Sequence, residues 1–217
     1  MICAIILAAG TSSRFKSDVP KQFQTLNGKL VIDYSIRAFL SCSSIDRLVI
    51  VVPPKKVQDL QNLYSDHIIV EGGFNRKSSS FNGLLACPQG TNKILIHDAA
   101  RALINKDLIE RCIEKVKYYD AVSTVIPVKD TVVKIENNKI IEIPDRNQIY
   151  LEQTPQAFTY KVILDAHKNI DLDVTDDIKL VKEAGIEPAI IYGYENNFKI
   201  TTKDDFLLAE ILLKEKK

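Results

Sequence analysis

The first stretch of the chain that could do chemistry is a loop carrying two cations. Ala8, Ala9 and Gly10 end an apolar run, and Arg14 and Lys21 follow seven residues apart. The small residues allow a ligand to lie against the backbone. In doubly wound sheets ligands bind where strands end, and N–H groups beside two cations suit a polyphosphate. The loop therefore predicts an anion site, although a solvated surface loop is the alternative.

Residue spacing excludes two common phosphate motifs for this loop. A dinucleotide-binding fingerprint starting at Gly10 requires glycine where the chain has Ser12 and Phe15. A P-loop starting at Gly10 requires glycine at Phe15, just before Lys16. The loop is thus a phosphate-binding candidate of another kind.

A second candidate segment reads GGFNRKSSS and contains Gly73, Arg76 and Ser79. Two glycines let backbone approach a planar ligand, and serines provide helix caps and hydroxyl groups. Taken alone, a plain strand-to-helix turn explains this segment equally well.

The third candidate is His97-Asp98-Ala99-Ala100-Arg101, which directly follows the apolar run KILI. A carboxylate at the tip of a buried strand, next to small residues and an arginine, can hold magnesium bound to phosphate. A helix-capping role is the alternative for Asp98. We expect His97 to point into the protein interior.

Weaker candidates follow along the chain, and absences narrow the chemistry. These candidates are Asp130-Thr131, Arg146, Gln153-Thr154-Pro155-Gln156, Thr175-Asp176-Asp177 and the NFKIT segment that contains Lys199. For Thr175-Asp176-Asp177, a helix cap with a negative first turn is the simpler interpretation. The three dispersed histidines suggest neither a histidine metal site nor a Ser-His-Asp triad. We therefore expect the reaction to depend on cationic side chains, magnesium and positioning of the reactants rather than on a side-chain base.

The elements that must position these residues alternate between strand and helix. This alternation predicts an α/β, Rossmann-like doubly wound, mostly parallel sheet with helices on both faces. The expected strands are 2–7, 48–52, 68–70, 93–97, 121–128, 189–192 and 199–201. The expected helices are 29–40, 57–64, 78–87, 106–118, 161–168, 176–184 and 203–213.

One segment departs from this alternation. Residues 132–143 alternate apolar and polar side chains around Asn137-Asn138, which predicts a β-hairpin with a tight turn. We expect it to project as an arm of about residues 131–147 from a single domain, 1–217. Composition leaves open whether the arm packs on its own domain or on a second subunit.

Length and composition exclude several classes of protein. The 217 residues suit one α/β domain, and 46% hydrophobic with 26% charged residues exclude wholesale disorder. Lys and Arg (29) balance Asp and Glu (28), so we expect no nucleic-acid or membrane partner. No apolar stretch would span a bilayer, and the N-terminus has no basic region typical of a signal peptide. Four scattered cysteines indicate reduced thiols, and we expect a cytoplasmic protein.

The motifs together resemble one enzyme family, the 2-C-methyl-D-erythritol 4-phosphate cytidylyltransferases of non-mevalonate isoprenoid precursor synthesis. In family order, the chain contains LAAGTSSRF, PKQ, GGFNRKSS, HDAAR, PVKDT, DRN, QTPQAF, TDD and NFKIT over nearly its whole length. The related ribitol-5-phosphate cytidylyltransferases share several motifs but usually resemble LAGGTGTR and HDSVRP. LAAG and HDAAR therefore favour methylerythritol phosphate over ribitol phosphate or another polyol or sugar phosphate.

The resemblance implies a role for each motif. Arg14, Lys21 and Arg146 would be catalytic, and Asp98 would be associated with Mg²⁺. The residues assigned to CTP are Ala8, Ala9, Gly10, Gly73, Arg76, Ser79, Asp98, Ala99, Arg101 and Lys199. Thr131, Arg146 and Thr154 would contact the sugar-phosphate acceptor. In the family the arm is embraced by a second subunit, which implies a homodimer in which Thr131 and Arg146 reach the partner's site.

The chain departs from the family pattern at a few positions. Ala102 replaces a proline, Phe74 and Asn75 replace common acidic residues, and Ser80 replaces a usual valine. These departures concern base recognition and loop rigidity rather than the reaction type. A non-catalytic nucleotide-binding regulator could keep the glycines and lose the cations, so the retained Arg14 and Lys21 favour an enzyme. A bare interaction domain would leave the clustering of motifs at strand ends unexplained.

Overall fold

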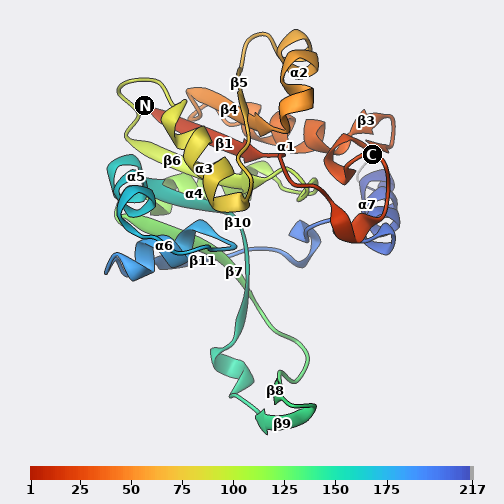
Figure 1. Ribbon diagram of the computed structural model, residues 1–217, viewed down its shortest axis with the longest axis vertical. Helices are drawn as coiled ribbons and strands as arrows, with labels where there is room; N and C mark the ends of the chain where they lie inside the picture. The colour runs from red at the N-terminus through yellow and green to blue at the C-terminus, as the bar shows by residue number, and fades with distance from the viewer. Residues whose placement is uncertain (216–217) are drawn as a thin grey trace.

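Strands of the computed structural model, which describes residues 1–215, form a seven-stranded central sheet in the order β11-β7-β10-β6-β1-β4-β5 (Figure 1). They are β1 (Ile2–Leu7), β4 (Arg47–Val52), β5 (Ile68–Glu71), β6 (Lys93–Asp98), β7 (Ala121–Pro127), β10 (Tyr150–Thr159) and β11 (Ala189–Tyr192). Within this sheet β10 alone runs antiparallel to its neighbours. The predicted mostly parallel, doubly wound α/β sheet is confirmed.

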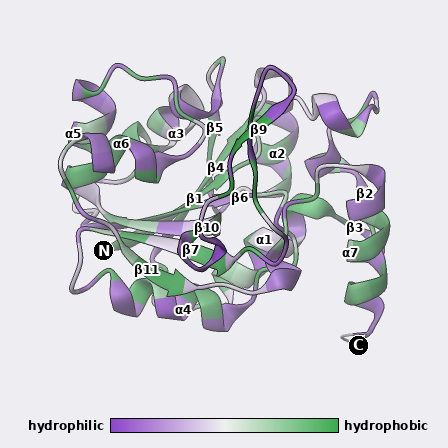
Figure 2. Cartoon of the chain, turned by 90° about the horizontal axis from the view of Figure 1, so that it is seen from below, coloured by the Kyte–Doolittle hydropathy of each residue, from purple (hydrophilic) through white to green (hydrophobic). Residues whose placement is uncertain are grey.

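Helices cover both faces of this sheet (Figure 2). They are α1 (Val31–Leu40), α2 (Val57–Leu63), α3 (Arg76–Leu85), α4 (Lys106–Lys115), α5 (Tyr160–Asn169), α6 (Asp177–Glu183) and α7 (Lys203–Glu215). Side chains of α1, α2 and α4 share one core with Ala4 and Ile6 of β1. Side chains of α3, α5 and α6 share a second core with Cys3 and Ile5. Because successive strand residues point to opposite faces, an apolar run such as β1 fits only between two such layers.

A third, smaller core joins the two ends of the chain. Phe15 and Leu26 from the N-terminal part pack with Ile200 and with Ala209 of α7. A short hairpin, β2 (Thr25–Leu26) with β3 (Lys29–Leu30), turns at Asn27 and Gly28, whose φ values are positive. This core holds the segment around Lys199 against the N-terminal loop.

Two parts of the sheet differ from the sequence-based prediction. The strand expected at 199–201 is wrong, because that segment is an irregular loop anchored by one bond from the Ile200 amide to the Ala100 carbonyl. Conversely, the sequence did not predict β10, which lies between β6 and β7 in the sheet. None of the helices in residues 1–215 is long and apolar enough to cross a bilayer.

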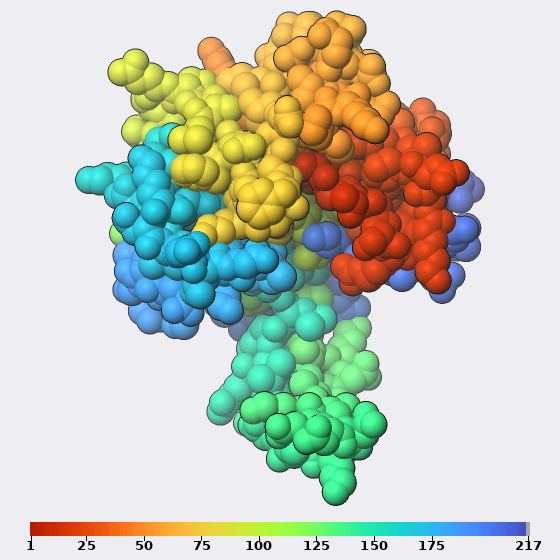
Figure 3. Space-filling model, in the orientation of Figure 1, coloured from red at the N-terminus to blue at the C-terminus, as the bar shows by residue number. Residues whose placement is uncertain are grey.

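The predicted hairpin is present and projects from the body (Figures 1 and 3). It consists of β8 (Lys134–Glu136) and β9 (Lys139–Glu142), joined by Asn137 and Asn138 at φ of 49° and 60°. These left-handed conformations are those of a type I′ turn, which asparagine tolerates. The isoleucines of the arm stay exposed, so the arm does not pack on its own domain: Ile135, Ile140, Ile141 and Ile143.

Candidate active site

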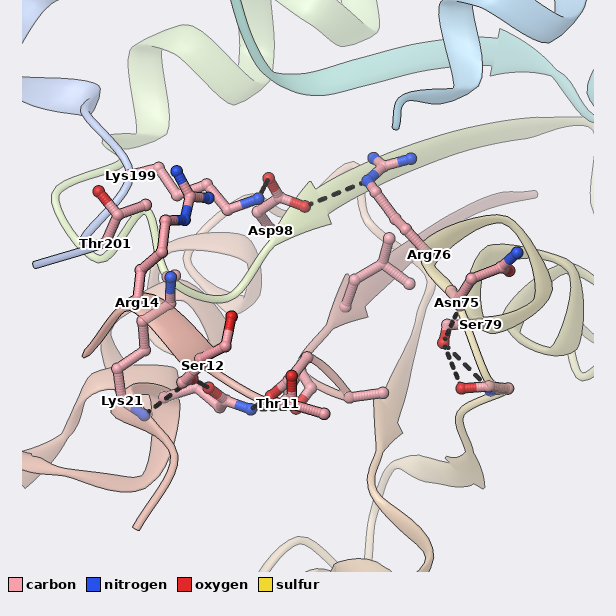
Figure 4. A pocket seen from close by; sticks show the side chains of 18 of the residues that line it. Thr11, Ser12, Arg14, Lys21, Asn75, Arg76, Ser79, Asp98, Lys199 and Thr201 are labelled. Atoms are coloured by element: carbon pink, nitrogen blue, oxygen red, sulfur yellow. Dashed lines mark hydrogen bonds and ion pairs between the residues drawn. The ribbon is translucent and has the colours of Figure 1, made fainter. Parts of the chain in front are cut away.

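The carboxyl ends of β1 and β6 open into a cleft of about 360 Å³ (Figure 4). Three segments line it: residues 7–14 after β1, residues 73–76 with Ser79 at the start of α3, and Asp98 at the tip of β6. Lys21, Gln22, Ala100, Lys199 and Thr201 complete the lining. The structure thus brings together the three strongest sequence candidates, as expected for strand ends in a doubly wound sheet.

The loop after β1 is held in shape by the buried side chain of Gln22. Its amide nitrogen donates to the carbonyl oxygens of Ala8 (2.6 Å) and Gly10 (2.8 Å). Its amide oxygen accepts from the Ser12 hydroxyl at 3.0 Å. Ser12 adopts a left-handed φ of 59°, and the amides of residues 10–12 donate to no acceptor among residues 1–215. Successive N–H groups in such a turn form an anion-binding concavity.

Gly10 leaves the floor of the cleft open. A Cβ added there would meet nothing within 4 Å, so the space beside the backbone belongs to the cleft. Gly72 and Gly73 are restricted instead, because an added Cβ would lie 2.2 Å from Ala9 Cβ and 2.1 Å from Ser78 Oγ. Gly72 therefore allows this segment to approach the loop after β1, and Gly73 allows it to turn tightly into α3.

Cations occupy one side of the cleft, as Figure 4 shows for Arg14, Lys21 and Lys199. Lys21 is only 9% exposed. Burial and then the neighbouring charge of Lys199 lower the pKa of Lys21 to about 8. A lysine with a lowered pKa is a cation short of counter-charge, which a polyphosphate would supply.

Asp98 lies between Lys199 on one side of the cleft and Arg76 on the other, and its carboxylate lies within 4.0 Å of three cationic side chains. Its Oδ2 is 2.8 Å from Lys199 Nζ and 4.0 Å from Arg101 Nε, and its Oδ1 is 3.6 Å from Arg76 Nε. Burial opposes ionisation of Asp98, but the charges of Lys199, Arg76 and Arg101 hold its pKa well below the usual range. Asp98 is therefore a permanent carboxylate in the cleft, rather than the helix cap weighed from sequence.

Behind Asp98 a buried hydrogen-bond chain fixes the tip of β6. The Thr154 hydroxyl accepts from the Asp98 amide at 3.0 Å and donates to His97 Nδ1 at 3.0 Å. His97 Nε2 faces the Arg101 carbonyl at 3.4 Å, and since a carbonyl only accepts, Nε2 carries the hydrogen. Burial lowers the pKa of His97 to about 3, so the ring is neutral. His97 points into the interior, as predicted.

Several residues assigned from the resemblance lie outside the cleft lining. Ala99 is fully buried and its neighbour Ala100 lines the cleft instead. Arg101 lies beneath the cleft, where its guanidinium donates to the carbonyls of Asn197 and Glu152. Thr154 is only 3% exposed, and both its hydrogen bonds support the site from behind.

Thr131 and Arg146 belong to the arm and are not among the residues that line the cleft of their own chain. Both are exposed. The Arg146 guanidinium donates to the Lys129 carbonyl at 2.9 Å, which leaves most of its donors pointing to solvent. One chain therefore assembles the nucleotide side of the expected site without these two acceptor candidates.

The structure locates three of the departures from the family pattern. Phe74 is 96% exposed at the rim of the cleft, and Ala102 is buried in the core beside α7. Ser80 is fully buried and its hydroxyl donates to Asp177 Oδ1 at 2.7 Å. The serine thus gives a buried carboxylate a hydrogen-bond donor that valine would lack.

Sequence reasoning missed two residues that organise the cleft. Gln22 belongs to the quoted PKQ motif, but its polar neighbours Lys21 and Gln24 do not indicate that its side chain is buried. Asp176 caps α6 by accepting from the Lys179 amide, as expected, but Asp177 points inward and contacts Arg76. Two adjacent aspartates at a helix start carry no local signal that separates these roles.

A sequence profile of one family, described as 2-C-methyl-D-erythritol 4-phosphate cytidylyltransferase, matches residues 2–215. A curated enzyme of that name from Alkaliphilus oremlandii is 36% identical over 98% of this chain and 95% of its own length. Another from Clostridium botulinum strain Eklund 17B is 34% identical, over 98% of this chain and 99% of its own length.

Solved structures with related names share the fold. The 4-diphosphocytidyl-2C-methyl-D-erythritol synthase from Anaerococcus prevotii superposes with a TM-score of 0.87 at 26% identity, covering 98% of this chain and 96% of its own. The 2-C-methyl-D-erythritol 4-phosphate cytidylyltransferase from Thermus thermophilus gives a TM-score of 0.81 at 27% identity, covering 97% and 98%.

Proposed function

Because this chain belongs to the 2-C-methyl-D-erythritol 4-phosphate cytidylyltransferase family, we propose that it transfers the cytidylyl group of CTP to 2-C-methyl-D-erythritol 4-phosphate. The products are 4-diphosphocytidyl-2-C-methyl-D-erythritol and pyrophosphate. The enzyme is a CTP-dependent nucleotidyltransferase of isoprenoid precursor synthesis. The observation that carries this proposal is the cleft in which the loop after β1, Lys21 and Asp98 converge, within a chain that the family profile matches over residues 2–215.

The reaction consists of attack by the acceptor phosphate on the α-phosphorus of CTP. A phosphate monoester has its second pKa near about 6, so the attacking oxygen is already ionised at neutral pH. No side-chain base is needed, in keeping with the buried, neutral His97. Repulsion between two anions is then the main obstacle.

Arg14, Lys21 and Lys199 are the groups that lower this obstacle in our proposal. They occupy one side of the cleft, where they neutralise the triphosphate and the extra charge that develops as the fifth oxygen approaches phosphorus. The amides of residues 10–12 add donors that are already oriented. The cleft therefore accelerates the reaction by holding the nucleophilic oxygen close to the α-phosphorus and by neutralising the negative charges that repel each other.

Magnesium fits this cleft through Asp98. The carboxylate is ionised, and among the described residues it is the only acidic side chain in the lining. Within residues 1–215 no cluster of three or more acidic, histidine or cysteine side chains could cage a metal. Mg²⁺ is commonly held by one or two carboxylates together with substrate phosphates and water. When bound, it would neutralise charge on the triphosphate, and Lys199 would share Asp98 with it.

A homodimer would complete the acceptor side of the site. The arm exposes four isoleucines, and Arg146 and Thr131 lie near them without reaching their own cleft. Exposed apolar residues gathered on a projecting hairpin are typical of an interface. In our proposal Arg146 of one chain holds the acceptor phosphate at the partner's cleft. The cytoplasmic location stays a prediction.

Pyrophosphate release measured with CTP and Mg²⁺ tests this function. Methylerythritol phosphate and ribitol 5-phosphate are offered in parallel, and we expect turnover with the first. Turnover with ribitol phosphate alone would move the chain to the related activity. Binding of CTP without turnover of either acceptor would favour a regulator. Sedimentation of the wild-type chain beside Ile140→Asp tests the dimer, because a charge on the arm face should separate the subunits.

A further inference from the structure

A buried carboxylate on α6 lies behind the nucleotide cleft, and the reaction does not use it directly. Asp177 is 0% exposed and does not line the cleft. Its carboxylate receives three donors: Arg76 Nη1 at 2.6 Å, Ser80 Oγ at 2.7 Å and His167 Nε2 at 2.9 Å. Its own amide donates to Gln156 Oε1 at 3.2 Å.

The hydrogen bonds offset the free-energy cost of burying the Asp177 carboxylate. A buried carboxylate is costly unless it is paired and hydrogen-bonded, and replacing such a pair with apolar residues often stabilises a protein. The Asp177 cluster joins α3, α5 and α6, which apolar side chains already join in the core on this face. Apolar contacts therefore also hold the three helices together, and what distinguishes the Asp177 cluster is its contact with Arg76.

Arg76 is the element that links this cluster to the cleft. One nitrogen of its guanidinium bonds Asp177, and Nε lies 3.6 Å from Asp98 Oδ1 on the cleft side. Figure 4 shows Arg76 reaching toward Asp98 from the side opposite Lys199. Lys199 Nζ lies at 2.8 Å from the other Asp98 oxygen. Arg76 is thus held between two carboxylates, one buried and one in the site.

We propose that Asp177 is a positioning residue that fixes the Arg76 guanidinium through its bond to Nη1 and so keeps Asp98 available to the nucleotide. This inference rests on the proposed function, because the nucleotide is CTP there. Without Asp177, Arg76 would turn fully onto Asp98 and compete for the carboxylate oxygens. Arginine suits this role because its planar guanidinium can donate to two carboxylates in fixed directions, whereas the ammonium group of lysine is a single point charge.

Ser80 and His167 support Asp177 from the other side. Both donate to Oδ1, which leaves Oδ2 for Arg76. The His167 ring is stacked with Phe81 of α3 at a centroid distance of 5.7 Å. The bonds from Ser80 and His167 therefore fix the orientation of the Asp177 carboxylate independently of Arg76. Second-layer partners of this kind typically change activity by about 10- to 100-fold when removed.

The test is a double-mutant cycle on Asp177→Asn and Arg76→Lys. We expect Asp177→Asn to lower kcat/KM for CTP by about tenfold and to weaken CTP binding measured without acceptor. The KM for the acceptor should stay unchanged. In the Arg76→Lys background the further effect of Asp177→Asn should nearly vanish, because Asp177 acts through Arg76.

Controls separate positioning from folding. Asp176→Asn makes the same change one residue earlier at an N-cap that asparagine also fills, and we expect wild-type kinetics. Ser80→Ala removes a single donor to Asp177 and should reproduce the CTP effect in weaker form even if Asp177→Asn folds poorly. Thermal unfolding of all variants is measured in parallel.

Three results would overturn the inference. They are equal effects of Asp177→Asn in both Arg76 backgrounds, a lowered unfolding temperature with unchanged CTP binding, and an effect confined to the acceptor. A wild-type chain that binds CTP but releases no pyrophosphate would refute the proposed function instead. The CTP-binding measurements of the double-mutant cycle would still test the role of Asp177.

Discussion

The nucleotide cleft and the arm differ in how their side chains are held. In the cleft, Asp98 and Lys21 are buried, and Asp98 contacts cations from three separate segments. On the arm, the Arg146 side chain makes one hydrogen bond within residues 1–215, and the isoleucines are exposed. One chain alone organises the cleft, whereas the exposed side chains of the arm have few partners within residues 1–215. In our proposal, nucleotide binding therefore needs one chain, whereas acceptor binding needs two.

Removal of Lys21 should have the largest effect, because it lies on the cleft side of this comparison. We expect Lys21→Ala to lower kcat by roughly 10²–10³, as for other groups that stabilise developing charge. Single-turnover kinetics with CTP and acceptor measure it. Lys16→Ala is the control, since Lys16 lies in the same segment but outside the cleft lining. Near-normal turnover of Lys21→Ala would refute the charge argument.

Removal of Arg146 should instead raise the KM for the acceptor by about 10- to 100-fold, the value of a charge-assisted hydrogen bond or two. The KM for CTP should stay unchanged. Lys134→Ala, another exposed cation of the arm, is the control and should leave both constants unchanged. An equal rise in both KM values would contradict the separation of cleft and arm.

Mixing the two variants tests whether the arm serves the partner. In a dimer of one Lys21→Ala chain and one Arg146→Ala chain, a shared site leaves one cleft with both residues intact. A one-to-one mixture should therefore regain about a quarter of wild-type turnover, because half of the dimers are mixed. If Arg146 served its own chain, no activity would return.

A smaller effect should appear in the pH profile. Because the pKa of free Lys21 is about 8, kcat/KM for CTP should fall about tenfold per pH unit above that value. Lys21→Arg should lack this limb, since arginine keeps its charge. Unfolding does not cause the loss. Between about 8 and 10.5 the folded chain binds this proton less than the unfolded chain does, so this group's contribution to stability rises with pH.

Removal of Gln22 should have the smallest kinetic effect and a clear effect on stability. Gln22→Ala removes the donor to the buried Ala8 carbonyl and to the partly buried Gly10 carbonyl, which costs about 1–3 kcal/mol in free energy of unfolding. Because the loop after β1 loosens, the KM for CTP should rise severalfold. Gln24→Ala is the control, since its amide donates only to exposed partners. Chemical denaturation and steady-state kinetics measure the two effects.

The sequence predicted those parts of the fold whose pattern is local. The run in β1 is apolar on both faces, and Asn137-Asn138 specifies a tight turn, so both elements are confirmed. β10 was missed because it contains Pro155 and polar residues whose hydrogen bonds lie inside the protein, as the Thr154 hydroxyl does. The segment 199–201 was misassigned because Ile200 is buried by α7 rather than by a sheet neighbour.

For the site, the sequence predicted which strand ends meet but not which atoms pair. Arg14, Lys21, Asp98 and Lys199 were expected near one another and line one cleft. The inward role of Asp177 depends on Arg76, 101 residues earlier in the chain, and no local pattern contains such a separation. Contacts of this kind arise only from packing of α3 against α6.

β10 has a consequence for protein engineering. This single strand begins beside the arm at Tyr150 and continues inward to Thr154, which holds the backbone of Asp98. An arm transplanted together with β10 would therefore replace part of the scaffolding of the cleft. A workable chimera must place its outer junction before Tyr150, so that the native strand beneath Asp98 stays whole.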